Sequence, residues 1–232
     1  MVTLVLLPGM DGTGGLFAPL LAELDAAITP VVVRYPCNEP LDYTALTSLA
    51  RAALPREGRY VILGESFSGP IAVRLAAEAP KGLIGLILCA SFVANPTPRL
   101  RRLRALVPIA PVALLARAVG PRRLMGRFQT AALRQLLRDA LRSVPDRVLK
   151  ARILATLDVD VSAELASVRV PTRYLRATED AVIGSAPAEG YLRAAREGKV
   201  VDVVGPHCLL QCVPHAASSA IRDFLGTANN AQ

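Results

Sequence analysis

Residues that build metal sites and disulfide frameworks are scarce in this chain of 232 residues. Its cysteines and histidines are Cys37, Cys89, Cys208, Cys212, His207 and His215. In a chain this long, four cysteines at such spacing do not indicate a disulfide framework. Cys208, Cys212 and the adjacent His207 would supply three of the four ligands of a structural zinc site, but their spacing matches no zinc motif. We therefore interpret the cysteines as buried free thiols and expect neither a metal nor a cofactor.

The chain also lacks a long uninterrupted apolar run, although 52% of its residues are hydrophobic. A helix that spans a membrane needs about 20 apolar residues, and the best candidate, 105–116, is interrupted by Pro108 and Pro111. Residues 1–7 contain no basic side chain and lead directly into a glycine-rich turn, which predicts a strand rather than a signal peptide. We expect a cytoplasmic protein with a large buried core, organised as one domain with an inserted segment.

Acidic residues are nearly absent from about one quarter of the chain. Residues 97–152 contain fourteen lysines and arginines but only Asp139 and Asp146 as acids. We favour a solvated basic face as the interpretation; a sharper alternative is docking to an anionic lipid surface or an acidic acyl carrier. Nucleic-acid binding is not expected, because Phe128 is the only aromatic residue among these arginines. The sequence does not predict an oligomeric state.

Glycine-rich loops often bind phosphate, but the loop at 8–15 lacks both common nucleotide motifs. Its glycines at 9, 12, 14 and 15 do not form G-x-G-x-x-G, and no G-K-[ST] follows them. Nucleotide binding is therefore disfavoured.

Short apolar runs alternate with amphipathic stretches over most of the sequence. Strands are predicted at 2–7, 29–33, 60–63, 83–88, 172–177 and 200–204, and helices at 16–24, 43–54, 69–78, 186–196 and 214–225. Continuously apolar strands separated by helices predict an α/β fold with a mostly parallel sheet flanked by helices. Residues 1–94 and 162–232 are assigned to this core, and 226–232 to a frayed polar tail.

Residues 95–161 interrupt this alternation and contain no convincing strand. They include six prolines and a predicted amphipathic helix at 131–142. We interpret 95–161 as an inserted helical cap. Its leucines and prolines predict an apolar pocket.

The segment Leu63-Gly64-Glu65-Ser66-Phe67-Ser68-Gly69 joins a predicted buried strand to a predicted helix. A serine on such a turn, with small residues two positions away on either side, is typical of a nucleophile elbow. Ser68 stands where the usual pattern has glycine. An ordinary turn with a serine helix cap is the alternative. Ser68 as nucleophile is disfavoured, because Pro70 would then occupy a position that must be small.

Ser66, Asp180 and His207 each follow a predicted strand directly. The carboxyl ends of parallel strands meet at one sheet edge, where ligands bind. Glu179 is an alternative acid, and His215 is the only other candidate base. His207 alone could instead be a turn residue.

Together these features resemble the α/β-hydrolase family. The resemblance rests on the loop 8–12, the elbow 64–68, the inserted cap, and the segments 177–180 and 205–207. This chain departs from the family in having Pro8 where histidine is usual and Ala177 where glycine is usual. Its first strand corresponds to the family's third, so we expect a minimal N-terminal edge.

The resemblance implies acyl transfer by a Ser-His-Asp triad. Ser66 would be the nucleophile, His207 the base and Asp180 the orienting acid, with an oxyanion hole formed by the N–H groups of Met10 and Phe67. The expected substrate is a small molecule, a carboxylic ester or thioester with an apolar acyl or alcohol part. The alternatives are an acyltransferase with the same triad and a non-catalytic binding protein. A serine nucleophile argues against haloalkane dehalogenase or epoxide hydrolase chemistry.

Overall fold

Six parallel strands form one sheet in the computed structural model, which describes residues 2–230. Their order across the sheet is β2-β1-β3-β4-β5-β6. They are β1 (Val2–Leu7), β2 (Ile28–Val32), β3 (Tyr60–Glu65), β4 (Leu83–Cys89), β5 (Thr172–Ala177) and β6 (Gly198–Val203). Every residue of β3 and β4 is buried, as the continuously apolar runs predict for strands covered on both faces.

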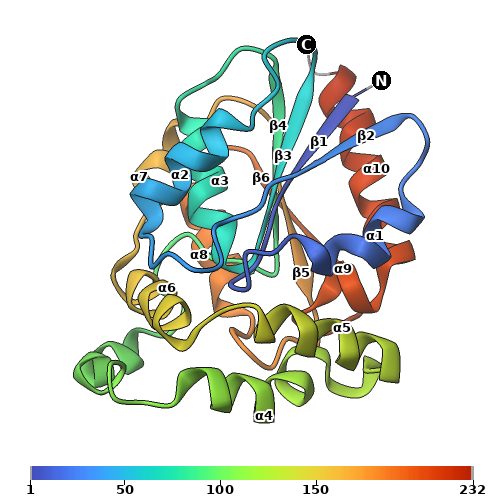
Figure 1. The fold of residues 1–232 in the computed structure, drawn as a ribbon. Coiled ribbons are helices and arrows are strands. Elements are labelled where there is room, and N and C mark those ends of the chain that lie inside the picture. Colours follow the sequence, from blue (N-terminus) through green and yellow to red (C-terminus); the bar gives the residue numbers. More distant parts are fainter. Residues whose placement is uncertain (1, 231–232) are drawn as a thin grey trace.

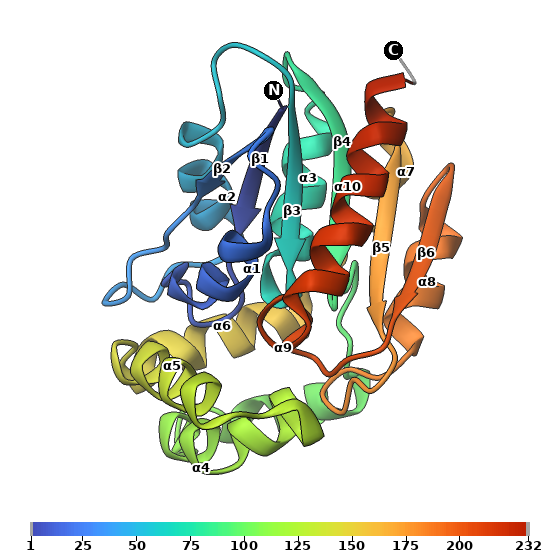
Figure 2. The same ribbon diagram turned by 90° about the vertical axis from the view of Figure 1, so that its right-hand side faces the viewer.

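Helices cover both faces of the sheet (Figures 1 and 2). One face packs against α1 (Ala18–Glu23), α9 (Leu209–Cys212) and α10 (Pro214–Asn230). The other packs against α2 (Tyr43–Ala52), α3 (Gly69–Ala77), α7 (Ser162–Ser167) and α8 (Ala186–Ala194). The alternation within β1 illustrates the division, because Leu4 and Leu6 belong to the first core and Val5 and Leu7 to the second. The predicted α/β fold is confirmed.

The connection between β4 and β5 lies across the carboxyl ends of the strands (Figure 2). It contains η3 (Pro98–Leu106), α4 (Val112–Met125), η4 (Gly126–Phe128), α5 (Ala131–Arg142) and α6 (Asp146–Asp158) before α7. An antiparallel bridge between Ala94 and Asp160 closes this segment at its base. The division into a core and a cap domain stays a prediction; its limits lie next to this bridge.

Local signals explain why α5 forms where its periodicity predicts. The Thr130 hydroxyl accepts a hydrogen bond of 3.1 Å from the Leu133 N–H at the helix start. Leu137, Ala140 and Leu141 are buried on one face, and the arginines of the helix lie on the other.

The predicted frayed tail is wrong over its described part. Helix α10 continues through Gly226 to Asn230, because Ala228 is buried in the core and the Arg59 guanidinium donates to the Asn229 carbonyl. Residues 231–232 lie outside the described residues. Within residues 2–230, no helix combines the length and the apolar character required to cross a membrane.

Candidate active site

Ser66 lies on a strained turn between β3 and α3. Its φ is +47°, a left-handed conformation that costs energy for a residue with a side chain. The turn is possible because its neighbours are small: a Cβ on Gly64 would lie 2.7 Å from the Ala72 Cβ, and one on Gly69 would lie 1.9 Å from the Ser91 Oγ. The backbone thus has the geometry of a nucleophile elbow.

Ser68, at the position where glycine is usual, ties this turn to the loop after β1. Its hydroxyl donates a short hydrogen bond to the Pro8 carbonyl oxygen. Because its one hydrogen is used there, it accepts from the Tyr35 hydroxyl at 2.7 Å. The sequence marked this serine only as a departure from a pattern, and its bonding role became visible in the structure.

A chain of hydrogen bonds joins the three residues predicted at the sheet edge. The Ser66 Oγ lies 2.8 Å from the His207 Nε2, and the His207 Nδ1 lies 2.7 Å from an Asp180 carboxylate oxygen. The side chains of His207 and Asp180 are almost completely buried. A charged carboxylate only accepts, so Nδ1 carries the proton and Nε2 is free to accept from Ser66.

Three hydrogen-bond donors and the nearby His207 ring set the protonation state of Asp180. Burial by itself would raise its pKa, but the His207 ring and the N–H groups of Val182 and Ile183 outweigh burial and hold the pKa below its ordinary value. Asp180 is therefore ionised near neutral pH and keeps the imidazole in one tautomer.

The alternative acid and base lie elsewhere. Glu179 forms an exposed ion pair with Arg127, 2.6 Å apart, and not a contact with His207. The His215 side chain is 84% exposed and contacts Glu23. The Asp11 carboxylate orders its own loop by accepting from the Thr13 N–H at 2.9 Å.

Met10 and Phe67, the predicted oxyanion donors, belong to the two turns that flank Ser66. Phe67 is the second residue of the short helix η2 (Ser66–Ser68), in the first turn, where backbone N–H groups have no acceptor within the helix. Its ring stacks on Tyr43 at 4.7 Å, which turns the side chain into the core. Met10 lies in a turn closed by the Gly12 N–H and the Gly9 carbonyl, 3.0 Å apart, and lines the same cavity as Ser66.

Arg152 holds this turn from the β4–β5 connection, and sequence reasoning did not single it out. Its side chain is fully buried. Its Nη1 donates to the carbonyl oxygens of Met10 at 2.7 Å and Asp11 at 2.9 Å, and its Nη2 donates to that of Pro36 at 3.1 Å. Gly12 leaves room for this side chain, because a Cβ there would lie 2.7 Å from the guanidinium.

Glu65 is a second buried ionisable group that sequence reasoning left without a role. Burial raises its pKa to about 7, against a hydrogen bond of 2.9 Å from the Gln211 amide. It lines the cavity beside Ser66. An acidic residue at the end of an otherwise apolar strand was its signal in the sequence.

A cavity of about 300 Å³ opens beside Ser66 and His207. Its walls are mainly apolar and come from α4, α5 and α6, including Leu124, Leu137 and Leu149. The adjacent Cys208 also lines it, and burial raises the pKa of this thiol. All four cysteines are free thiols, two of them buried and two partly exposed. Within residues 2–230 no cluster of three or more potential metal ligands occurs.

Comparison with known proteins identifies the family. Residues 4–217 match the model of the alpha/beta hydrolase family. Because that match spans most of the chain, the protein belongs to the alpha/beta hydrolase family, as the sequence motifs predict. Comparison with curated protein sequences gave no match.

Solved structures with this fold include enzymes with different described activities. The enol-lactonase from Burkholderia xenovorans LB400 is 19% identical with a TM-score of 0.83, covering 97% of this chain and 91% of its own. The bromoperoxidase from Bacillus anthracis is 15% identical with a TM-score of 0.84 and the same coverage. A thermophilic esterase from Thermogutta terrifontis is 21% identical with a TM-score of 0.77, covering 98% and 89%. At these identities the likeness extends to the fold alone.

Proposed function

We propose that this protein is a serine hydrolase that cleaves a carboxylic ester or thioester with an apolar acyl or alcohol part. The observation that carries the proposal is the hydrogen-bonded chain from Ser66 through His207 to Asp180, of which Ser66 and His207 line an apolar cavity. The esterase and lactonase among the structures of similar fold are consistent with this reaction class.

In the proposed reaction the Ser66 Oγ attacks the carbonyl carbon while His207 Nε2 accepts the hydroxyl proton. The tetrahedral intermediate collapses to an acyl-enzyme, and His207 returns the proton to the departing alcohol or thiol. Water then attacks the acyl-enzyme with His207 again as base, releasing the acid and restoring Ser66. Asp180 stays ionised throughout and stabilises the imidazolium.

The N–H groups of Met10 and Phe67 would bind the oxyanion. Each such donor typically contributes about 10²–10³ to the rate. The Arg152 bonds to the Met10 and Asp11 carbonyls and the Ser68 bond to the Pro8 carbonyl support this role, because they restrain the turn that carries Met10.

The β4–β5 connection would act as a cap that selects the substrate. Its helices supply most of the apolar wall, and about 300 Å³ is at the small end of ligand cavities. We therefore expect short to medium apolar acyl groups to react faster than long ones.

A panel of nitrophenyl esters and acyl thioesters of increasing chain length tests the proposal, with Ser66→Ala as the control. We expect turnover by the natural protein that the variant lacks. Addition of alcohol acceptors separates hydrolysis from acyl transfer, because a transferase would form a new ester at the expense of the free acid. Folded protein that turns over no substrate in the panel would favour the binding-protein alternative.

A further inference from the structure

Helix α4 presents different residues to the cavity and to solvent. Val112, Ala116 and Gly120, spaced four residues apart, line the cavity. Leu114 and Leu115, on the same helix, are exposed to solvent. The inward face of α4 therefore forms part of the cavity wall. The leucines on its outward face are not buried against the rest of the protein.

The exposed apolar residues extend from α4 back through η3. No residue of η3 is buried. Of the eleven large hydrophobic residues exposed within the described chain, seven belong to residues 100–119 and form, with the exposed arginines of 99–122, what we call the η3–α4 face: Leu100, Leu103, Leu106, Ile109, Leu114, Leu115 and Val119. Single exposed leucines are common, but such a concentration indicates an interaction surface.

The charged residues of the segment that forms this face are all basic. Residues 97–138 contain ten arginines and no acidic residue. Arg101 and Arg104 form ion pairs with Asp158. Arg99, Arg102 and Arg122 are exposed and form no ion pair among the residues that the structure describes. A partner of this face must therefore be negatively charged.

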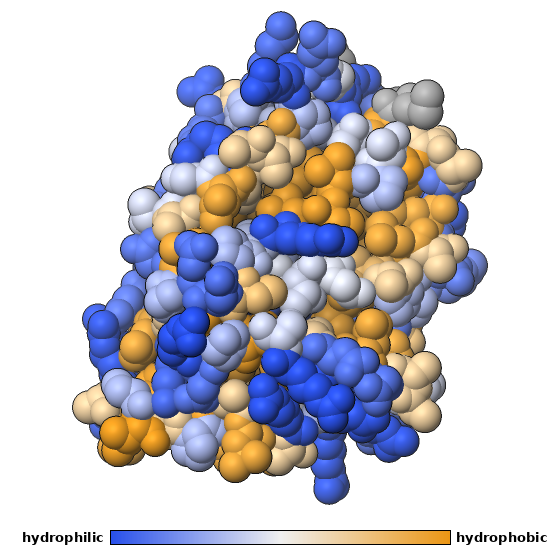
Figure 3. Space-filling model, viewed as in Figure 1, coloured by the Kyte–Doolittle hydropathy of each residue, from blue (hydrophilic) through white to orange (hydrophobic). Residues whose placement is uncertain are grey.

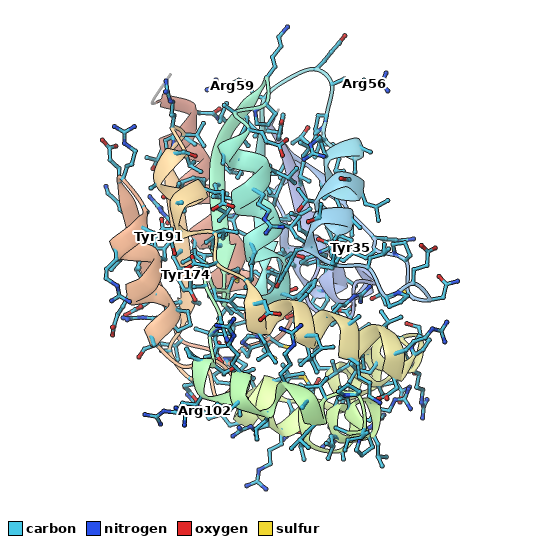
Figure 4. The ribbon with its side chains drawn as sticks, turned by 90° about the vertical axis from the view of Figure 1, so that its left-hand side faces the viewer. Tyr35, Arg56, Arg59, Arg102, Tyr174 and Tyr191 are labelled. Carbon is cyan, nitrogen blue, oxygen red and sulfur yellow. The ribbon has the colours of Figure 1, made fainter. Side chains whose placement is uncertain are left out.

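Two views locate the face at one end of the molecule. Figure 3 shows hydrophobic and hydrophilic residues interleaved along the lower edge, where α4 lies in Figure 1. In Figure 4, Arg102 lies at the end formed by the β4–β5 connection, and Arg56 and Arg59 lie at the opposite end. Arg56 and Arg59 therefore lie outside the η3–α4 face.

We propose that the η3–α4 face docks onto an anionic lipid surface. Aliphatic side chains such as Ile109, which is 79% exposed, would enter the boundary of the acyl chains, and guanidinium groups would bind lipid phosphates. The exposed apolar residues of the face are all aliphatic, whereas protein interfaces are enriched in Tyr, Trp, Phe and Met. A lipid surface therefore fits this face better than an acidic carrier protein.

Docking in this way would hold the cavity beside the membrane, because α4 borders both. Docking of this face does not depend on the proposed reaction. Membrane binding is measured without turnover, so a catalytically inactive protein can still support or overturn it.

Flotation with vesicles tests the proposal. The full chain is mixed with vesicles of phosphatidylcholine alone, or of equal parts phosphatidylcholine and phosphatidylglycerol. We expect binding to the anionic vesicles only, weakened by high salt. Each arginine near the surface is worth roughly fivefold in affinity.

Two variants of the face have matched controls, and each substitution changes an exposed residue. One variant carries Leu103→Gln, Ile109→Gln and Leu114→Gln, and its control carries Leu49→Gln, Leu192→Gln and Val204→Gln. The other carries Arg99→Gln, Arg102→Gln and Arg122→Gln, and its control carries Arg56→Gln, Arg169→Gln and Arg196→Gln. Both face variants should lose vesicle binding, and both controls should keep it.

The absence of tryptophan from the chain allows a reporter at a single position. Ile109→Trp should shift its fluorescence to shorter wavelength when anionic vesicles are added. Leu192→Trp, also at an exposed position and near the end of α8, should not. Equal shifts at both positions would contradict docking by this face.

Three other outcomes would overturn the proposal. The first is an absence of binding to anionic vesicles by the folded protein. The second is binding to an acidic acyl carrier protein but not to vesicles. The third is a dimer that dissociates when the face is altered, which would identify a second copy of the chain as the partner.

Discussion

Arg152 of α6 donates a hydrogen bond of 2.7 Å to the carbonyl oxygen of Met10, and so links the β4–β5 connection to the turn beside Ser66. The two residues are 142 positions apart. Burial lowers the pKa of Arg152, although the guanidinium stays charged. A buried cation bonded to three backbone carbonyls restrains that turn strongly, which leads to the first prediction.

Replacing Arg152 should impair catalysis without affecting substrate affinity. Arg152→Met leaves three carbonyl oxygens without a partner, and a misplaced Met10 N–H should lower kcat by about 10²-fold while KM changes little. Arg152→Lys keeps the charge without the planar fork and should be intermediate. Steady-state kinetics on an ester measures this, with Arg147→Met on the exposed side of α6 as control. A folded Arg152→Met with unchanged kcat would exclude this positioning role.

Ser68→Ala should destabilise the fold. The substitution leaves the Tyr35 hydroxyl and the Pro8 carbonyl without partners, which should lower the free energy of unfolding by about 2 kcal/mol. Urea denaturation measures the change, and Ser48→Ala, at an exposed helix position, should stay within about 0.5 kcal/mol of the natural protein. Equal urea midpoints of unfolding for Ser68→Ala and Ser48→Ala would contradict the structural role of Ser68.

Because of Glu65, the free energy of unfolding should decrease as pH rises. Burial raises its pKa from 4.5 to about 7, so below 4.5 the carboxyl is protonated whether the chain is folded or not. Between these values the folded chain keeps a proton that the unfolded chain has lost, and stability decreases as pH increases. Above pH 7 the folded protein carries the whole penalty of the buried charge, about 3 kcal/mol.

Glu65→Gln removes that charge and should stabilise the protein at pH 8 but not at pH 4. Urea denaturation at both pH values is the measurement, and Glu57→Gln, at an exposed position, is the control. A gain that is equal at both pH values would mean that the buried charge is not its cause.

Asp180→Asn should lower kcat by about 10⁴, as the equivalent change does in a serine protease. An asparagine amide can donate to His207 Nδ1, which would put the ring proton on Nε2 and prevent that atom from accepting from Ser66. Glu179→Gln, one residue away, removes only an exposed ion pair and should leave kcat nearly unchanged. Similar losses in the two variants would contradict the assignment of the acid.

Regular elements were predictable because their signals are local. Residues 2–7, 172–177 and 131–142 form their elements at the predicted limits. Residues 2–7 are a nearly continuous apolar run, and the helix at 131–142 has both a cap and one apolar face. The meeting of Ser66, Asp180 and His207 was predictable too, because parallel strands bring their carboxyl ends to one edge. Their catalytic roles stay predictions.

Contacts made by the β4–β5 connection were not predictable. Nothing near Arg152 in the sequence indicates a bond to Met10. Likewise, the leucines of 95–161 suggested a pocket lining. Some leucines of α4 to α6, such as Leu124, do line it, whereas Leu103 and Leu106 of η3 are exposed. Composition alone cannot separate these groups, because which side of a helix faces the core depends on how the helices pack.

The most direct measurement for the central claim is the intact mass of the protein after exposure to a fluorophosphonate, which reacts with an activated serine. We predict one covalent adduct on the natural protein, none on Ser66→Ala, and greatly slowed labelling of His207→Gln. Circular dichroism establishes that each variant is folded. An unlabelled natural protein, or an adduct that persists in Ser66→Ala, would contradict the proposed triad.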